Sequence, residues 1–412
     1  TRHNERHWEV WRNRACDPHR SAMDGFEALE EALCSGGAEG AFRFLAERAL
    51  SQKNYPLLFE VRLMQKRHEL GLALVQTGGL GDVPEEQRPA YEQAYITAAR
   101  EVGGLFLADG DIPRSWSYFR AIGEPAPVAA AIDHVQPGEG IDRVIEIAFL
   151  EGVNPRKGFE LMLENYGICR AITTFGQYPS RTGRQECLHL MLEALYRELV
   201  RSLKRTIEGV EGKAPETESV GKLIEGRDWL FEGNTYYVDT SHVASVIQYS
   251  PELEDRTMLE KAVELTEYGR RLAPMFQFRG NPPFEDIHVD HGYYLRALLG
   301  RDVDAAIAHF RAKIAAQEEA GEGDTSAAQA LVNLLARLER YDLAIEISRA
   351  HLKGVNPLDL ACPTAAQLCQ LARDYPKLRE VAMEREDLLS YAAGVLQGGK
   401  TAEAGQTNRG SI

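Results

Sequence analysis

The chain has 412 residues, of which 44% are hydrophobic and 26% are charged, so it can bury a large core. Its 62 Asp and Glu residues outnumber its 47 Lys and Arg residues, which gives a net charge of −15. An acidic surface repels phosphate backbones and anionic lipids, and no apolar run approaches the roughly 20 residues that cross a bilayer. We therefore expect neither nucleic acid nor a membrane as a partner.

The six cysteines are scattered through the chain without a C-x-x-C pair. A secreted disulfide framework would be denser, and a structural zinc site would need paired spacing. The first residues of the sequence are charged and contain no apolar segment typical of a signal peptide. These features predict free thiols and a cytoplasmic protein.

Helical periodicity dominates the first part of the chain. Residues 1–76 predict N-terminal helical pairs, and a linker rich in Gly and Pro follows at 77–89. Residues 90–167 predict further helical repeats, the last of them a helix that ends at Gly167.

The pattern becomes irregular between residues 168 and 291. This region keeps a strong helical stripe at 185–207, but it also contains a polar linker at 209–219 and an aromatic stretch at 223–239. Regular helices return at 292–397. The tail at 398–412 has no apolar period, and we expect it to be disordered.

Residues 326–357 form the best-defined unit of the chain: two helices, a tight turn and a closing proline. Ala344 provides the small side chain where the two helices would cross, Pro357 ends the unit, and Ala306 and Phe310 mark a weaker half-repeat. This unit resembles the tetratricopeptide-repeat (TPR) family. The resemblance implies an all-α fold of stacked antiparallel helix pairs, an α-solenoid, here interrupted by an irregular insert. It implies no chemistry, because such arrays are mainly interaction scaffolds.

Carboxylates and imidazoles are concentrated at residues 280–300, where a Pro-Pro stop precedes an apolar helix. Side chains of these types bind metal ions and transfer protons near neutral pH. If Asp286 caps the helix, His288 and His291 lie on one face, with Glu285 at the preceding turn. The alternative interpretation is a capped helix start whose acids neutralise the helix dipole.

Two further histidines could join this cluster. His242 follows a helix cap at Asp239, where a helix N-terminus keeps an imidazole neutral. His189 lies beside the apolar stripe of residues 185–207. Each could equally be a surface or boundary histidine of a packed helix.

A pocket for a small substrate could be built from two groups of side chains. One is aromatic and the other is polar; together they comprise Trp229, Tyr236, Tyr237, Gln177 and Arg181. The same residues could form a local core and a solvated loop.

Two classes of function remain open from the sequence. The first is a metal-dependent hydrolase or lyase acting on a small polar substrate. Its Zn²⁺ or Fe²⁺ would be held by His242, Glu285, His288 and His291, with His189, Asp239 or Asp286 as catalytic groups. The second is a non-catalytic TPR-type scaffold that binds a partner protein or peptide on its concave face. The irregular insert and its aromatic stretch favour the enzyme, which is the function we predict from the sequence, whereas the repeat pattern and the lack of a catalytic motif favour the scaffold as the alternative.

Overall fold

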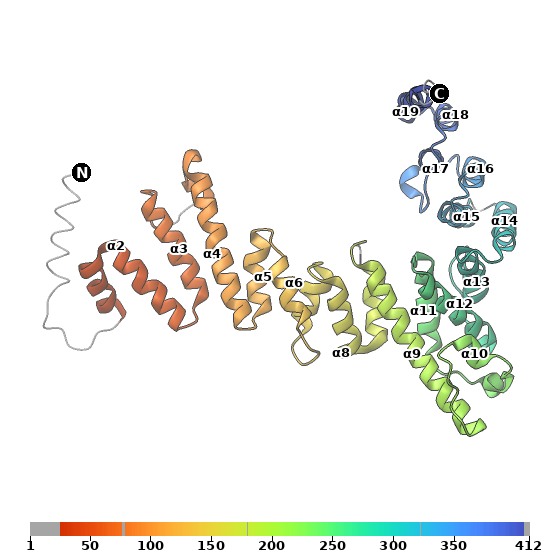
Figure 1. Ribbon diagram of the computed structural model, residues 1–412, viewed down its shortest axis with the longest axis horizontal. Helices are drawn as coiled ribbons and strands as arrows, with labels where there is room; N and C mark the ends of the chain where they lie inside the picture. Colours follow the sequence, from red (N-terminus) through yellow and green to blue (C-terminus); the bar gives the residue numbers. More distant parts are fainter. Residues whose placement is uncertain (1–24, 76–78, 179, 322, 408–412) are drawn as a thin grey trace. The chain divides into compact units, whose positions relative to one another are not determined.

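The computed structural model describes residues 25–407 except 76–78, 179 and 322 (Figure 1). Within these residues the protein is all-helical, as the sequence predicts, and the one β feature is an isolated bridge between Arg279 and Asp286. The chain divides into two compact units, Thr1–Asn165 and Tyr166–Ile412. None of the described helices is long and apolar enough to span a membrane.

The first unit consists of helices that pack on their neighbours in the sequence. Its elements are α2 (Gly25–Ser51), α3 (Tyr55–Glu69), α4 (Arg88–Ala108), α5 (Ile112–Ala121), α6 (Ala126–Asp133), α7 (Asp142–Ile145), the π-helical turn η3 (Glu146–Leu150) and the start of α8 (Pro155–Gly176). Leu58, Ala99 and Val102 are fully buried in a core shared by α2, α3 and α4. Val128, Ile132 and Ile147 belong to a second core that follows it along the chain.

The boundary between the units falls inside α8. Gly167 adopts φ 76° and ψ 179°, a conformation that breaks the helix and that glycine accepts without strain. The sequence correctly marks Gly167 as a stop, but the helix resumes and continues to Gly176, where we expected an irregular segment.

The second unit contains the remaining helices. They are α9 (Arg184–Glu211), α10 (Val220–Ile224), α11 (Thr240–Tyr249), α12 (Arg256–Arg271), α13 (Ile287–Leu298), α14 (Val303–Ala320), α15 (Ser326–Arg337), α16 (Tyr341–His351), α17 (Ala365–Ala372), α18 (Tyr375–Glu384) and α19 (Leu388–Thr407). Short 3₁₀ turns, η4 (Asp228–Asn234), η5 (Ser250–Glu252), η6 (Pro274–Phe276) and η7 (Pro357–Asp359), lie in the connections.

Aspartate and threonine side chains cap several of these helices. Asp255, Asp286 and Asp374 each accept a hydrogen bond from the backbone N–H three residues later. Thr364 forms a capping box with Gln367 at the start of α17. Such caps satisfy N–H groups that the first helical turn leaves without a partner.

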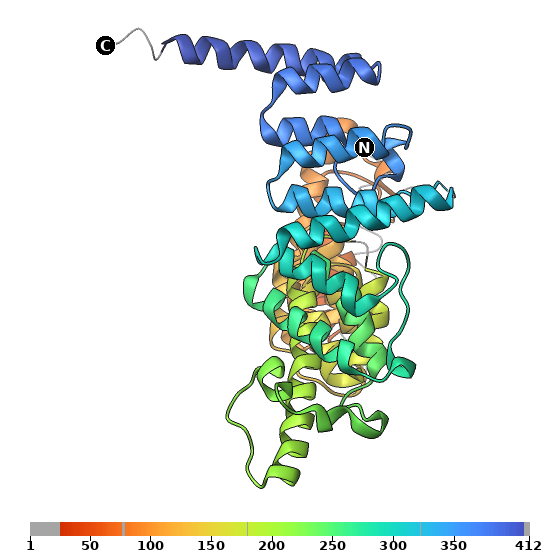
Figure 2. The same ribbon diagram turned by 90° about the vertical axis from the view of Figure 1, so that its right-hand side faces the viewer.

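Each helix from α12 to α19 packs on the next one in the sequence, and Figure 2 shows these helices lying side by side. Alternate helices also contact one another, α11 with α13 and α13 with α15. Ala344 is fully buried in a core that also contains Leu331, Leu335 and Phe310. The burial of Ala344 is compatible with the small residue that the sequence pattern predicts at the crossing of α15 and α16, and the crossing itself stays a prediction.

One expectation about the cysteines is wrong at a single residue. Cys34 is disulfide-bonded, so the prediction of free thiols fails there, although Cys169, Cys362 and Cys369 carry free thiols. The last helix, α19, continues to Thr407, and the disordered tail at residues 398–412 stays a prediction. Residues 408–412 lie outside the described part of the chain.

Candidate functional site

The stretch at residues 280–300 folds as a capped helix start. The Asp286 carboxylate accepts the Val289 N–H at 3.0 Å, and the backbone N–H of Gly280 donates to the Glu285 carbonyl at 3.0 Å. The chain thus turns back on itself and enters α13 at Ile287. Asp290, one turn into the helix, returns a bond by accepting the Asp286 N–H at 2.9 Å.

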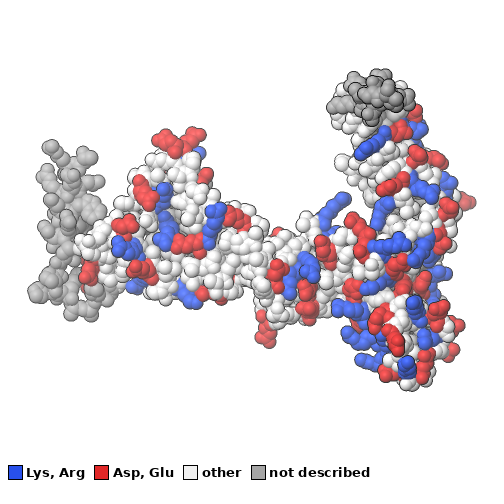
Figure 3. Space-filling view, in the orientation of Figure 1, with Lys and Arg blue, Asp and Glu red and all other residues white. Residues whose placement is uncertain are grey.

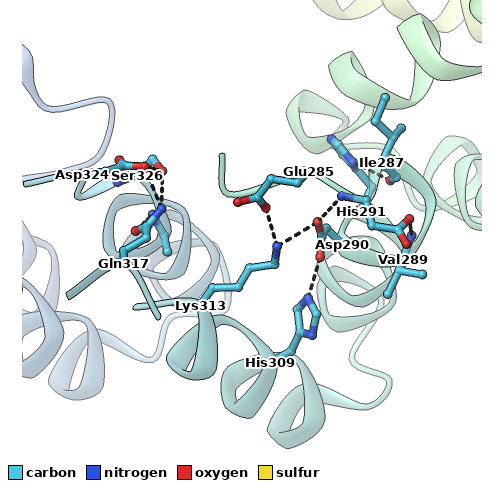
Figure 4. Close-up of polar contacts among 12 residues, drawn as sticks. Glu285, Ile287, Val289, Asp290, His291, His309, Lys313, Gln317, Asp324 and Ser326 are labelled. Carbon is cyan, nitrogen blue, oxygen red and sulfur yellow. Dashed lines mark hydrogen bonds and ion pairs between the residues drawn. The ribbon is translucent and has the colours of Figure 1, made fainter. Parts of the chain in front are cut away.

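Asp290 is the centre of a charged network between α13 and α14 (Figure 4). Its side chain is only 2% exposed, and its carboxylate contacts His309 Nε2 at 2.7 Å and Lys313 Nζ at 3.0 Å. Because a carboxylate only accepts, the His309 ring donates through Nε2. A buried carboxylate with these donors satisfies the condition under which a charge is tolerated in a protein interior.

Lys313 links this buried carboxylate to a more exposed one. Its Nζ lies 2.5 Å from Glu285 Oε2. Burial opposes the charged form of Lys313, but the hydrogen bonds that it donates to Glu285 and Asp290 outweigh this effect and raise the pKa of the ammonium. Burial likewise acts to raise the pKa of Glu285, yet the Lys313 hydrogen bond prevails and lowers it. The pair is therefore ionised together at neutral pH.

The polar face of α14 continues beyond Lys313. Gln317, one turn further along, donates to Asp324 Oδ2 at 2.9 Å and to Ser326 Oγ at 3.0 Å, and accepts the Ala327 N–H at 3.1 Å (Figure 4). The residues that make these contacts are spaced by four along α14. His309 and Lys313 join α14 to α13, and Gln317 joins it to the start of α15. The network fixes the packing of three consecutive helices.

The two histidines of α13 are buried rather than exposed to a ligand. His291 is 2% exposed; its Nδ1 lies 2.7 Å from the Ile287 carbonyl, and its ring stacks on Phe284 at 4.3 Å. His288 is 1% exposed and packs against Gly269, where a Cβ atom would lie 2.1 Å from the ring. Neither nitrogen of His288 has a hydrogen-bond partner among the described residues. Burial lowers the pKa of both histidines to about 4.

The four side chains predicted to hold a metal have different surroundings in the structure. Glu285 pairs with Lys313, His288 and His291 are packed in the core, and His242 lies in the first turn of α11. In the part of the chain that the structure describes, no group of three His, Cys, Asp or Glu side chains is placed to bind a metal ion. As placed, these residues do not form a ligand set, and the metal site stays a prediction.

The predicted catalytic residues are also separate. Asp239 caps α11, and its hydrogen bond from the Ser241 hydroxyl is the main cause of its lowered pKa. Asp286 caps α13. His189 is half-buried on α9, with an Nε2 atom that has no hydrogen-bond partner among the described residues.

The predicted substrate residues lie on different elements. Tyr236 is 52% exposed and meets the edge of the Phe276 ring, whereas the Tyr237 hydroxyl donates to the Leu230 carbonyl at 2.8 Å. Trp229 is half-buried in η4. Gln177 and Arg181 are exposed in the connection between α8 and α9. The contacts of Tyr237 favour a local core over a pocket lining.

The partners of Asp290 were not predicted from the sequence. His309 and Lys313 follow it by 19 and 23 residues and belong to the next helix. Their spacing of four was the available signal, because residues four apart on a helix point the same way.

Charges of both signs are mixed over the face of the second unit drawn in Figure 3.

No protein-family model, curated protein or solved structure matches the chain.

Proposed function

We propose that this protein is a non-catalytic helical-repeat scaffold that binds a segment of a partner protein. The observation that carries the proposal is the packing of the second unit, in which each helix from α11 to α18 contacts the next one and the alternate helices α11, α13 and α15 contact one another in series. Stacked helix pairs with this contact pattern form quasi-one-dimensional arrays. Their inner layer of alternate helices offers a long surface for peptides.

The contacts of the candidate site support the scaffold. Asp290, His309 and Lys313 satisfy one another, and Gln317 holds the start of α15. Such a network keeps neighbouring helices in a fixed register, which a binding surface composed of several helices requires. The TPR resemblance of residues 326–357 points to the same class of function.

Selection of ligands from a displayed peptide library tests the scaffold directly. The full chain would be the bait, and amide hydrogen exchange would then locate each selected peptide. We expect slower exchange on α11, α13 and α15, with little change on α12, α14 and α16. Failure to enrich any peptide, or protection confined to α12, α14 and α16, would contradict the proposal.

The metal-dependent hydrolase or lyase is tested separately by the metal content of the purified chain. A near-stoichiometric amount of zinc or iron that disappears in a His288→Asn/His291→Asn variant would favour the enzyme over the scaffold. The exposed histidine His134 provides the matched control, because His134→Asn leaves both buried imidazoles in place.

A further inference from the structure

The connection between α16 and α17 contains a short extended segment that lies against α15. After the 3₁₀ turn Pro357–Asp359, Leu360 has φ −82° and ψ 122°, which is extended backbone. Leu360 is half-buried against the core, Ala361 is exposed, and Cys362 is buried. This alternation is typical of a β-strand with one side facing an apolar surface.

Two amide side chains of α15 bind the backbone of this segment. Gln329 Oε1 accepts the Ala361 N–H at 2.7 Å, and Asn333 Nδ2 donates to the Ala361 carbonyl at 2.8 Å. Gln329 and Asn333 are four residues apart, so they project from one face of the helix. Together they supply one acceptor and one donor to a single residue, as a neighbouring strand does in a ladder.

These contacts define the ligand that the site accepts. Both hydrogen bonds go to the backbone, so they select an extended conformation and a residue other than proline, whatever its side chain. The flanking residues Leu360 and Cys362 face the apolar core, and burial raises the pKa of the Cys362 thiol to about 11, so it is a neutral, apolar group there. The matching ligand is an extended segment with a small residue between two apolar ones.

The segment has few other attachments. None of the residues of the preceding turn is buried, and Leu358 is 91% exposed. The segment is therefore held mainly by the two side-chain bonds and by two apolar contacts, which a competing segment of the same pattern can reproduce.

We propose that Gln329 and Asn333 form a backbone-binding site for an extended segment of a partner protein, and that the chain's own residues 360–362 occupy this site until the partner replaces them. The inference rests on the proposed scaffold function and names its ligand class and its regulation. It assigns α15, a member of the inner series of helices, as the surface that binds the partner.

A labelled peptide with the sequence of residues 355–364, under reducing conditions, is the probe. Ala361→Pro in the full chain removes the N–H that donates to Gln329 and so releases the internal segment. We expect the peptide to bind this variant at least about tenfold more tightly than the wild type, because it no longer competes with the internal segment. Leu360→Ser, which releases the segment through its apolar contact, should give the same direction of change if Ala361→Pro does not fold.

Removing the site in the released background provides the decisive control. Asn333→Ala combined with Ala361→Pro should weaken peptide binding by about tenfold, the effect expected for one lost hydrogen bond. Gln370→Ala, which removes an exposed amide from α17, should change nothing. Equal affinity of the wild type and Ala361→Pro, or indifference to Asn333→Ala, would overturn the inference.

The two proposals fail in different ways. Library peptides could bind α11 and α13 with an affinity that does not depend on Asn333. That result would support the proposed scaffold function and overturn the site proposed on α15. Wild-type chains that dimerise by exchanging the segment would give a different result, in which the peptide competes only with the segment of a second copy. That result would overturn the inference that the ligand is a segment of a partner protein.

Discussion

Two buried histidines make the second unit sensitive to acid. The pKa of His288 and of His291 is lowered to about 4 by burial, against about 6.5 for an unfolded histidine. Between these values the unfolded chain binds more protons than the folded one, so stability falls as the pH falls below about 6.5. From pH 7 to pH 5 we expect a loss of about 2 kcal/mol for each histidine, measured by urea unfolding.

A substitution separates this effect from the titration of carboxylates. His288→Asn should flatten the pH dependence between pH 7 and pH 5, whatever its effect on stability at pH 7. His134→Asn removes an exposed histidine and should leave the slope unchanged. A slope that is the same in wild type and His288→Asn would show that His288 does not titrate on unfolding.

At the level of single elements, the α13–α14 connection depends on a buried carboxylate. Asp290→Asn leaves Lys313 and His309 without their charged partner and should cost about 3 kcal/mol. Glu285→Gln is the matched control: it removes the other carboxylate on Lys313, but Glu285 is 47% exposed, so it should cost less than about 1 kcal/mol. Similar costs in urea unfolding would mean that the burial of Asp290 contributes nothing.

The last helix, α19, packs closely on α18 at a glycine. A Cβ atom at Gly394 would lie 2.8 Å from Arg379 Cγ and 3.2 Å from the Tyr375 carbonyl, so this glycine lets α19 pack directly on α18. Gly394→Leu should separate the two helices and cost about 1–3 kcal/mol. Hydrogen exchange should accelerate in α19, whereas Ala392→Leu, on the exposed side of the same helix, should have little effect.

The comparison of α13 with α19 explains what the sequence could predict. The Asp286 cap is local information, because a helix start needs only the cap and the apolar residues that follow. The partners of Asp290 come from another helix. The packing of α19 on α18 depends on Gly394, and a glycine contributes nothing to a hydrophobic period. His288 looked like a ligand because its type is common in metal sites, but Gly269, 19 residues earlier, provides the space in which its ring is buried. The spacing of His309 and Lys313 indicates that they share a face of α14, but no spacing indicates which residue of another helix they contact.

At the scale of the whole molecule, the two units have separate cores. Phe59, Val102 and their neighbours bury one another in the first unit, whereas Ala344 belongs to a core formed by α13 to α18 in the second. Unfolding of the two cores is therefore expected to respond to different substitutions.

Ala344→Leu tests both the helix packing and the independence of the units. Leucine adds three carbon atoms to a site that is fully buried, and overpacking of this kind costs about 1–3 kcal/mol. In an array of helix pairs the loss affects neighbouring pairs first. Hydrogen exchange should therefore accelerate in α15 to α18 and stay unchanged in α2 to α4, while Ala305→Leu, at an exposed position of α14, should alter neither. Faster exchange in α2 to α4 would mean that the units unfold together, and wild-type stability would mean that α15 and α16 do not pack closely at Ala344.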